Sequence, residues 1–330
     1  MPARRNNRSR ASSERKRASS NRRRTSNNNR RRGRRILLPL LVILIFAVVG
    51  YFGYSFANPL LPVELEVGQV AVHFIDVGQG DAVLIQTADG HVLIDGGDNH
   101  MGERVVQYLR NAGVSELSYV IATHPHADHI GGLVDVLNTF PVNTLIMPNV
   151  AHTTRTFERF LDAIEYNNVP LGEPVAGSTL YVGDAVFTII APNSYGHANL
   201  NNYSVSIRMV LGETSFIFTG DAEVDSELEM ISAGHVLYSD VLHVGHHGSS
   251  TSTTQEFFDA VSPSIAVIQL SADNTYGHPH REVRERLAGV TVYRNDEHGD
   301  IILMTDGESI TVRSATLWRV WLTRFMQWIG

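Results

Sequence analysis

The stretch Thr123-His124-Pro125-His126-Ala127-Asp128-His129 decides how the whole chain is interpreted. It places three imidazoles and one carboxylate within six residues, directly after the apolar, β-like run 117–122. Imidazole and carboxylate together suit divalent metals such as zinc or manganese. A short loop at a strand end lets alternate side chains converge on one point, which a helix permits only at i, i+3 or i+4. The stretch therefore predicts a metal site rather than a histidine-rich surface loop.

Three further apolar segments end in a residue that can bind a metal. Residues 71–97 read as two or three short strands broken by glycine turns, the last ending at Asp95. Segment 214–221, TSFIFTGD, predicts a strand that leads to Asp221. Segment 240–250, DVLHVGHHGSS, predicts another that runs into paired histidines. Ligands on strand ends are positioned more rigidly than ligands on free loops, as hydrolytic metal chemistry requires.

Taken together, these segments resemble the metallo-β-lactamase superfamily and, within it, the hydrolase domain of ComEC-type competence (DNA-uptake) proteins. The resemblance covers roughly residues 68–313 and implies an α/β fold, a four-layer αββα sandwich with the metals at one edge between two sheets. It rests on stretches that occur in the family's order, namely FIDVGQGDA (74–82), NNYS (201–204), TGDAE (219–223), HHGS (246–249) and YGHP (276–279).

The resemblance implies two metal sites that share one carboxylate, with zinc or manganese as the ion. The first metal would be bound by His124 and His126, and the second by Asp128 and His129. Asp221 would bridge the two ions. Asp128 and Asp221 are therefore the carboxylates expected to be essential for catalysis.

The sequence does not decide whether His246 or His247 completes the second metal site. The strand end favours His246, but either ring can turn inward. Asp95 would orient the ligands through hydrogen bonds, which metal-bound histidine nearly always requires. Asp76 and Gln79 would do similar work, or the glycines beside them simply allow close approach of the backbone.

One departure from the superfamily concerns the first metal site. Most members place another histidine between the HxHxDH loop and the Gly-Asp, whereas this chain has Asn202 and Ser204 there, as in the ComEC-like pattern. His152 and His197 are candidate substitutes, although each fits a surface loop better. We therefore expect one or two divalent ions, with the second site better assured than the first.

The expected reaction is hydrolysis of a phosphodiester by metal-activated hydroxide, because a bound divalent metal lowers the pKa of its water to about 7. His278 is the candidate for catalysis at the leaving group, together with the paired histidine that is not a ligand. The chain has no cysteine, no G-x-S-x-G elbow and no phosphate loop, which excludes those chemistries. Substrate contacts are expected from Gln79, Asn202, Ser204, Asn274 and Tyr276.

The N-terminal segment predicts attachment to a membrane. Residues 1–35 contain 14 Arg and one Lys against one acid and should be disordered. The uncharged run 36–57 matches the roughly 20 residues that span a bilayer. The positive-inside rule then places the tail in the cytoplasm and the rest outside. We expect a single-pass signal anchor; the small residues before Asn58 leave open cleavage near Ala57 and secretion.

Two other segments flank the predicted hydrolase domain. Residues 58–67 read as a linker. Residues 314–330 read as an amphipathic helix that contains all three Trp of the chain. For this helix the sequence leaves three settings open: packing on its own domain, the membrane interface, or a partner protein.

Charge narrows the choice of substrate. Residues 36–330 carry 12 basic and 33 acidic side chains, a balance of −21, and no lysine. Because Lys and Arg drive non-specific duplex binding, we expect no broad DNA-binding face beyond a local patch of Arg281, Arg284 and Arg286. The first function considered is a nucleic acid hydrolase that works with competence partner proteins. The second acts on another extracellular phosphodiester, of choline-phosphate or teichoic-acid type, with cell-envelope partners. The third is a non-catalytic scaffold, and the complete set of predicted metal ligands argues against it.

Overall fold

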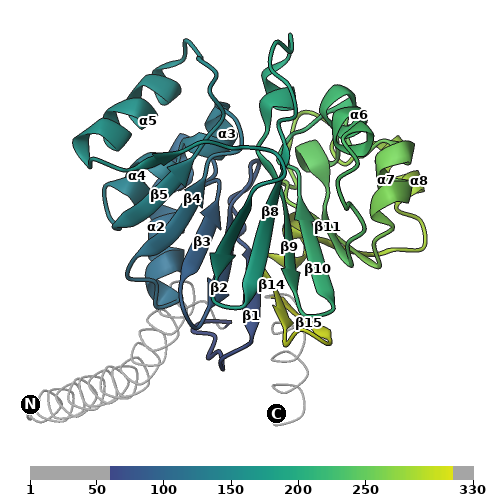
Figure 1. The fold of residues 1–330 in the computed structure, drawn as a ribbon, viewed down its shortest axis with the longest axis horizontal. Helices are drawn as coiled ribbons and strands as arrows, with labels where there is room; N and C mark the ends of the chain where they lie inside the picture. The colour runs from purple at the N-terminus through teal and green to yellow at the C-terminus, as the bar shows by residue number, and fades with distance from the viewer. Residues whose placement is uncertain (1–59, 315–330) are drawn as a thin grey trace, which may run out of the picture. The chain divides into compact units, whose positions relative to one another are not determined.

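Short apolar runs, many of them β-branched, form the two central layers of the molecule. In the computed structural model, which describes residues 60–314, they build two mixed sheets that face each other (Figure 1). The first sheet has the strand order β15-β14-β1-β2-β3-β4-β5-β6, and the second has the order β13-β12-β11-β10-β9-β8-β7. The first sheet comprises β1 (Val70–Phe74), β2 (Val83–Thr87), β3 (His91–Ile94), β4 (Leu117–Ile121), β5 (Val142–Ile146), β6 (Leu171–Gly172), β14 (Ile301–Thr305) and β15 (Ile310–Ser314). The second comprises β7 (Thr179–Val182), β8 (Ala185–Ala191), β9 (Ser206–Leu211), β10 (Thr214–Phe218), β11 (Val241–His243), β12 (Ile265–Ile268) and β13 (Thr291–Arg294).

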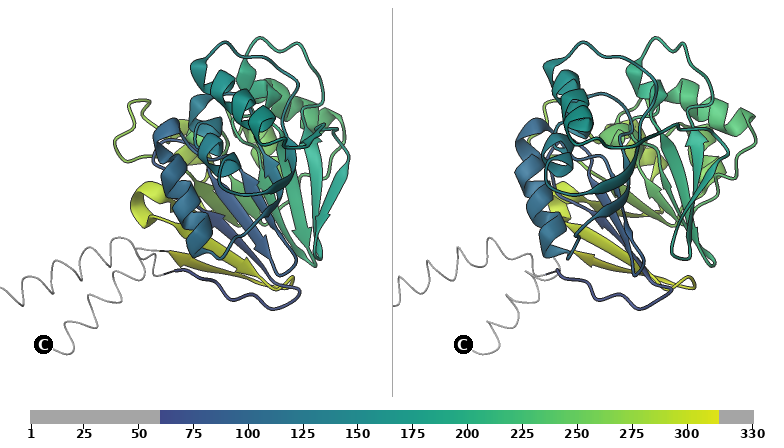
Figure 2. Two further views of the ribbon diagram at one scale, coloured as in Figure 1. Left: turned by 90° about the vertical axis from the view of Figure 1, so that its left-hand side faces the viewer. Right: turned by 60° about the vertical axis from the view of Figure 1, so that its left-hand side comes forward.

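Helices cover the outer face of each sheet, which Figure 2 shows from two further directions. On the first sheet lie α2 (Gly102–Asn111), α3 (Ala127–Ile130), α4 (Leu133–Leu137) and α5 (Arg155–Tyr166); on the second lie α6 (Val224–Ser232), α7 (Gln255–Val261) and α8 (Arg281–Arg286). The remaining short helices are η1 (Asn99–Met101), η2 (Leu200–Tyr203), η3 (Gly245–Gly248) and α9 (Asn295–His298).

Three apolar layers hold this arrangement together. Leu109 and Phe160 belong to the layer between the first sheet and its helices. Phe257 belongs to the layer between the second sheet and its helices. Phe74 and Phe218 belong to the layer between the two sheets, where their rings lie 6.2 Å apart. Burying side chains of this size stabilises the fold by about 1.5–3 kcal/mol each. The αββα sandwich expected from the sequence is confirmed for the described residues.

Strand direction positions the functional site. β3 and β4 are parallel neighbours in the first sheet, and β10 and β11 are parallel neighbours in the second. Each strand is followed by a predicted site residue: Asp95 after β3, His124 after β4, Asp221 after β10 and His247 after β11. All four strands were expected from the sequence, and the carboxyl ends of parallel neighbours meet at the same sheet edge.

The segment expected to be a linker packs on the domain from Leu60 onward. Val63 is buried against Ala71 and Ile302, with Leu61 and Leu65 beside them. Its apolar side chains explain this, because a free linker would leave them in water. Within residues 60–314 no helix combines the length and apolar character needed to cross a membrane. The predicted tail 1–35, the predicted span 36–57 and nearly all of the predicted helix 314–330 lie outside the described residues.

Candidate metal centre

The loop after β4 brings four predicted ligands to the edge between the sheets. His124 and His126 lie in the loop itself, and Asp128 and His129 lie in the short helix α3 that follows. His124 and His129 are fully buried. The ring centroids of these two histidines are 4.2 Å apart. The loop therefore converges as the spacing of its ligands predicts.

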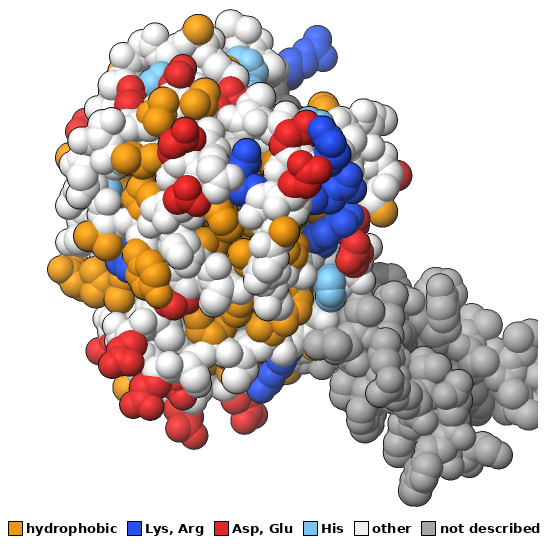
Figure 3. All heavy atoms as spheres, turned by 90° about the vertical axis from the view of Figure 1, so that its right-hand side faces the viewer, with side chains coloured by type: hydrophobic (Ala, Val, Ile, Leu, Met, Phe, Trp, Pro, Cys, Tyr) orange, Lys and Arg blue, Asp and Glu red, His pale blue; other side chains and the backbone are white. Residues whose placement is uncertain are grey.

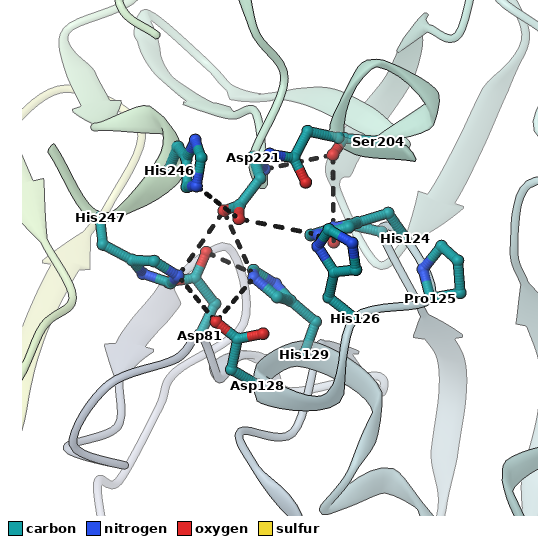
Figure 4. Close-up of polar contacts among 12 residues, drawn as sticks. Asp81, His124, Pro125, His126, Asp128, His129, Ser204, Asp221, His246 and His247 are labelled. Atoms are coloured by element: carbon teal, nitrogen blue, oxygen red, sulfur yellow. Dashed lines mark hydrogen bonds and ion pairs between the residues drawn. The ribbon is translucent and has the colours of Figure 1, made fainter. Parts of the chain in front are cut away.

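Asp221 stands at the centre of the cluster, and its two carboxylate oxygens face different histidines (Figure 4). Oδ1 lies 3.3 Å from Nε2 of His129 and 3.7 Å from Nε2 of His247. Oδ2 lies 3.7 Å from Nε2 of His124 and 3.6 Å from Nε2 of His246. One carboxylate thus separates two sets of imidazoles, as a bridging ligand between two ions would.

His247 rather than His246 lies with the second-site ligands. Its Nε2 is 3.4 Å from Oδ2 of Asp128, and Asp128, His129 and His247 offer ligand atoms within 4.8 Å of one another. The side chain of His246 is 23% exposed and that of His247 only 2%. The structure therefore favours His247 for this site, against the preference for His246 drawn from the strand end.

Buried atoms without hydrogen-bond partners show that the cluster suits a cation. Among the described residues, Nε2 of His129, Nε2 of His247 and Oδ1 of Asp221 are buried and have no such partner. Leaving a buried polar atom unpaired costs about 1–3 kcal/mol, and these three face one another. Imidazole nitrogen and carboxylate oxygen are ligands for divalent ions such as zinc. The donor set therefore fits the divalent metal that the sequence predicts.

Asp95 lies behind His129, where the sequence analysis placed an orienting carboxylate. Its Oδ2 is 2.7 Å from Nδ1 of His129. Thr123 donates its backbone N–H to Oδ1 at 2.8 Å and its hydroxyl to Oδ2 at 2.7 Å. These contacts fix the His129 ring with Nε2 pointing at Asp221.

Asp81 plays the matching part behind His247, and the sequence analysis did not single it out. Its Oδ1 lies 3.2 Å from Nδ1 of His247 and 3.6 Å from Nε2 of the buried His243. The hydrogen bond of Nδ1 of His247 goes to the backbone carbonyl of Gln269, at 3.0 Å. The only signal in the sequence was the position of Asp81 within the FIDVGQGDA stretch.

Gly80 explains how Asp81 reaches this position. The N–H of Asp81 donates to the carbonyl of Asp128 at 3.2 Å, so the two loops are in contact. Gly80 has φ +141°, and a Cβ there would lie 2.4 Å from the carbonyl oxygen of Asp128. Only glycine permits this approach, so Gly80 allows the loop that carries Asp81 to pack against the loop that carries Asp128.

The first metal site has fewer protein donors. Nε2 of His124 is 3.0 Å from Nδ1 of His126. The Ser204 hydroxyl lies 3.4 Å from Nδ1 of His124 and accepts from the N–H of Asp221 at 3.2 Å, so it supports two ligands from behind. The His152 ring lies 5.8 Å from the His126 ring.

His197 lies elsewhere, 3.5 Å from Glu229. In the described part of the chain neither His152 nor His197 belongs to a group able to bind a metal. A third imidazole for the first site is therefore not supplied by either of them.

His246 pairs with an acid that the sequence analysis also missed. Its Nδ1 lies 3.3 Å from Oε1 of Glu223 and 3.2 Å from the Thr251 hydroxyl. Asn202, expected to contact substrate, instead accepts the backbone N–H groups of Glu223 and Ser226 at 3.0 and 3.3 Å. Asn202 therefore holds the segment that carries Glu223.

The remaining predicted residues separate into two groups. The ring of Tyr276, 66% exposed, stacks on His278 with centroids 5.5 Å apart. His278 in turn lies 5.8 Å from the ring of His246. These two side chains form one flank of the centre, and the catalytic role of His278 stays a prediction.

The other three predicted side chains contact backbone groups rather than the predicted ligands. Asn274 bonds to the backbone of Ser271 and His278. Gln79 accepts the N–H of Ser271 at 3.4 Å. Asp76 accepts the N–H of Gly78 at 3.2 Å, and within residues 60–314 no contact joins it to a ligand of the cluster.

Burial and carboxylates set opposite charge states within the cluster. Burial lowers the pKa of His124 well below its usual value. Burial acts in the same direction at His129 and His247, but neighbouring carboxylates, Asp221 first among them, outweigh it and hold both pKa values well above the usual value. Burial alone would raise the pKa of Asp221, yet His129 and His247 hold it well below its usual value. A cation bound here would displace protons, so its affinity should rise with pH.

Comparison with known proteins agrees with this geometry. Residues 75–271 match the family model described as the metallo-beta-lactamase superfamily. ComE operon protein 3 of Bacillus subtilis (strain 168) is 33% identical over 250 residues, which cover 70% of this chain and 32% of that protein. Competence protein ComA of Neisseria gonorrhoeae is 30% identical over 243 residues, which cover 72% of this chain and 33% of that protein. The chain thus spans about a third of the length of these relatives.

Solved structures give a weaker likeness. The crystal structure of the metallo-beta-lactamase fold protein YhfI from Bacillus subtilis aligns over 72% of this chain and 99% of that chain. The TM-score is 0.49 and the sequence identity is 14%.

Proposed function

The chain belongs to the metallo-β-lactamase superfamily, and from this premise we propose that it is a phosphodiesterase that hydrolyses nucleic acid. The observation that carries the proposal is the central Asp221 carboxylate, whose Oδ1 faces His129 and His247 while its Oδ2 faces His124. Paired ions are a recurrent arrangement for displacement at phosphorus. The similarity to competence proteins supports nucleic acid as the substrate.

The proposed ligands combine the family resemblance, which supplies His126, with the clusters that the structure brings together. His124 and His126 would bind the first, Asp128, His129 and His247 the second, and Asp221 both. When bound, such ions supply an activated water and neutralise charge on the phosphoryl oxygens. Asp95 and Asp81 orient the imidazoles of His129 and His247, so that the ligand nitrogens are held in place before substrate arrives.

His246 is placed to hold a proton for the leaving oxygen. Glu223 faces its Nδ1 at 3.3 Å, and this contact orients the ring. Nε2 then points at the Asp221 side of the cluster, 3.6 Å from Oδ2. Proton transfer by a positioned side chain typically contributes about 10²–10⁴-fold to a rate. His278, beside the same ring, is the second candidate for this work.

We further propose that the enzyme works at the outer face of a membrane as a single-pass protein with its N-terminus in the cytoplasm. The basic tail and the uncharged run 36–57 support this orientation. Secretion after cleavage near Ala57 is the alternative. The similarity to competence proteins supports a role in DNA uptake together with competence partner proteins.

A second candidate substrate is another extracellular phosphodiester, such as a choline-phosphate or teichoic-acid group. The surface charge favours it. Figure 3 shows the face with α6, α7 and α8, where basic side chains gather in one cluster bordered by acidic ones. Arg281 of α8 lies within 4 Å of both Glu282 and Glu285. Such pairing leaves little positive charge for a phosphate backbone.

The test is hydrolysis by the full chain, reconstituted with manganese or zinc. A labelled single-stranded oligonucleotide and a generic aryl phosphodiester serve as substrates. Asp128→Ala is the inactive variant, and Asp225→Ala, an exposed acid on α6, is the matched control. Cleavage of DNA that Asp128→Ala abolishes and Asp225→Ala retains supports the nuclease. Cleavage of the aryl diester while DNA stays intact supports the second candidate, and inactivity on both contradicts an enzymatic role.

A further inference from the structure

A groove of about 1130 Å³ lies between α5 and the loop that follows β8. In Figure 1 both elements rise from the edge of the sandwich where the metal ligands lie. Its apolar lining includes Pro148 and Val150 before α5, Leu161 in α5, Val175, and Tyr195 in the loop after β8. No function considered above uses this groove.

The groove shares a wall with the metal centre. Pro148, Val150 and Phe157 line the groove on one side. On the other side they line a small cavity with His124 and Pro125. A single layer of side chains therefore separates the groove from a ligand of the first metal site.

The charge of the lining excludes a phosphate backbone from the groove itself. Glu173 is the only charged side chain among the lining residues, and no Lys or Arg is present there. A phosphodiester would be repelled by this carboxylate and would find no cation to replace its counterions. The part of a polyanionic substrate that fits the groove is therefore uncharged.

The polar atoms of the lining select a flat ring with N–H groups over an acyl chain. Tyr195 lines the groove and is 54% exposed, so its ring is accessible for a base to stack on. Asn149 is an exposed lining residue, and Glu173 can accept from a ring N–H or an amino group of a base. An acyl chain would bury these groups without hydrogen bonds, at a cost of about 1–3 kcal/mol for each. A nucleobase satisfies both the apolar walls and the polar rim.

A second aromatic surface lies on the opposite side of the ions. In Figure 4 His124 and His247 lie on opposite sides of Asp221. The groove borders the His124 side, and the stacked Tyr276 and His278 border the His247 side. A strand that crosses the centre with its phosphate at the ions would therefore meet a base-binding surface on each side.

We propose that the groove binds an unpaired nucleobase next to the scissile phosphate, so that the enzyme recognises single-stranded nucleic acid by its bases. This inference rests on the proposed nuclease function. It also resolves the conflict between a nucleic acid substrate and an acidic domain without lysine, because base stacking does not require positive charge. In a duplex the bases are paired and stacked on each other, so duplex should be a poor substrate.

The experiment compares cleavage of an oligothymidine with cleavage of an abasic oligonucleotide of equal length by the metal-reconstituted full chain. The Arg-rich tail binds phosphates, which both substrates share, so its contribution cancels in the comparison. The variant is Tyr195→Ala, and the matched control is Tyr238→Ala, a tyrosine of similar exposure (58%) that is not among the residues lining the groove. An aryl phosphodiester, which is too small to reach the groove, reports on the catalytic centre alone.

We expect KM to be about tenfold lower for the oligothymidine than for the abasic strand, as one stacked base typically provides. Tyr195→Ala should remove most of this difference while hydrolysis of the aryl diester is unchanged, and Tyr238→Ala should keep it. Equal KM for both strands, or equal cleavage of duplex, overturns the groove proposal and leaves the nuclease standing. Hydrolysis of the aryl diester without cleavage of any nucleic acid overturns the proposed function and the groove proposal with it.

Discussion

His129 in the metal centre and His73 in β1 are both fully buried, yet they face different groups. His129 lies among the carboxylates of Asp95, Asp221 and Asp128, which outweigh burial and raise its pKa well above the usual value. His73 lies 3.1 Å from the Tyr108 hydroxyl, and burial lowers its pKa to about 3. The difference shows that several neighbouring carboxylates together can outweigh burial at a histidine, whereas burial without them keeps it neutral.

The comparison also shows what identifies a metal centre. His73, like His129, has a buried Nε2 with no hydrogen-bond partner among the described residues. One unpaired nitrogen is therefore not a sufficient sign. The centre differs because several unpaired atoms lie within ligand distance of one another and because carboxylates accompany them. The predictions below test this distinction.

Replacing the shared carboxylate should have the largest effect. Asp221→Asn keeps the shape of the side chain but removes the charge that both sets of imidazoles face. We expect activity on an aryl phosphodiester to fall at least about a thousandfold, more than the 10- to 100-fold that loss of an outer partner typically costs. Metal content measured on the same samples should fall as well. Asp225→Asn serves as the matched control, and normal activity with a full metal load in Asp221→Asn would refute the bridging role.

His73 should make the fold sensitive to acid. Below pH 6.5 the unfolded chain binds a proton at this residue that the folded chain refuses until about pH 3. The contribution of His73 to the free energy of unfolding is therefore fully present above pH 6.5. It is lost as the pH falls, by about 4–5 kcal/mol at pH 3.

Urea unfolding of the wild type and His73→Asn at pH 7.5 and 4.5 measures this loss. Whatever its stability at pH 7.5, the variant should lose about 2–3 kcal/mol less than the wild type between the two values of pH. His100→Asn, an exposed histidine, should follow the wild type. An identical pH dependence in His73→Asn would show that His73 is not held neutral by burial.

Asp81→Asn should weaken metal binding without removing a ligand. The amide no longer offers a negative charge behind Nδ1 of His247, although the Gln269 carbonyl still accepts there. We expect about a 10- to 100-fold loss of affinity, measured by metal titration. Asp76→Asn in the same stretch should bind metal normally. If Asp81 were only structural, unfolding of the metal-free protein would change while the affinity stayed the same.

A helix cap away from the metal centre and from His73 should have the smallest effect. Thr154 caps α5 by accepting the N–H of Phe157 at 3.3 Å. Thr154→Ala should cost about 1 kcal/mol of unfolding free energy in urea. Metal affinity should not change. If Thr154→Ala lost as much unfolding free energy as is expected for His73 at low pH, buried groups would not contribute more to stability than this helix cap.

Much of the site could be predicted because local signals carry it. Four predicted site residues each follow a strand that an apolar run of sequence predicts: Asp95, His124, Asp221 and His247. The metal chemistry of HxHxDH depends on residue types and short spacing, which need no long-range contact. The fold class followed from the same stretches through their resemblance to one superfamily.

Other parts could not be predicted because they depend on contacts between distant segments. Asp81 looked like part of a glycine turn, and its place behind His247 depends on Gly80 packing against the backbone of Asp128. Glu223 meets His246 only because the start of α6 contacts the loop after η3, where the N–H of Val224 donates to the carbonyl of Thr251. Asn202 looked available for substrate, but backbone N–H groups occupy its oxygen.

The paired histidines mark the boundary between the two kinds of information. The sequence by itself predicted that one of them binds the metal, because both follow an apolar run that predicts a strand. Only the tertiary structure distinguishes the two, and it favours His247. Both residues have left-handed backbone, with φ 52° at His246 and φ 55° at His247, so the alternation of a strand does not continue into them. This turn directs His247 toward Asp128 and His246 toward Glu223, where the contacts of each ring fix its role.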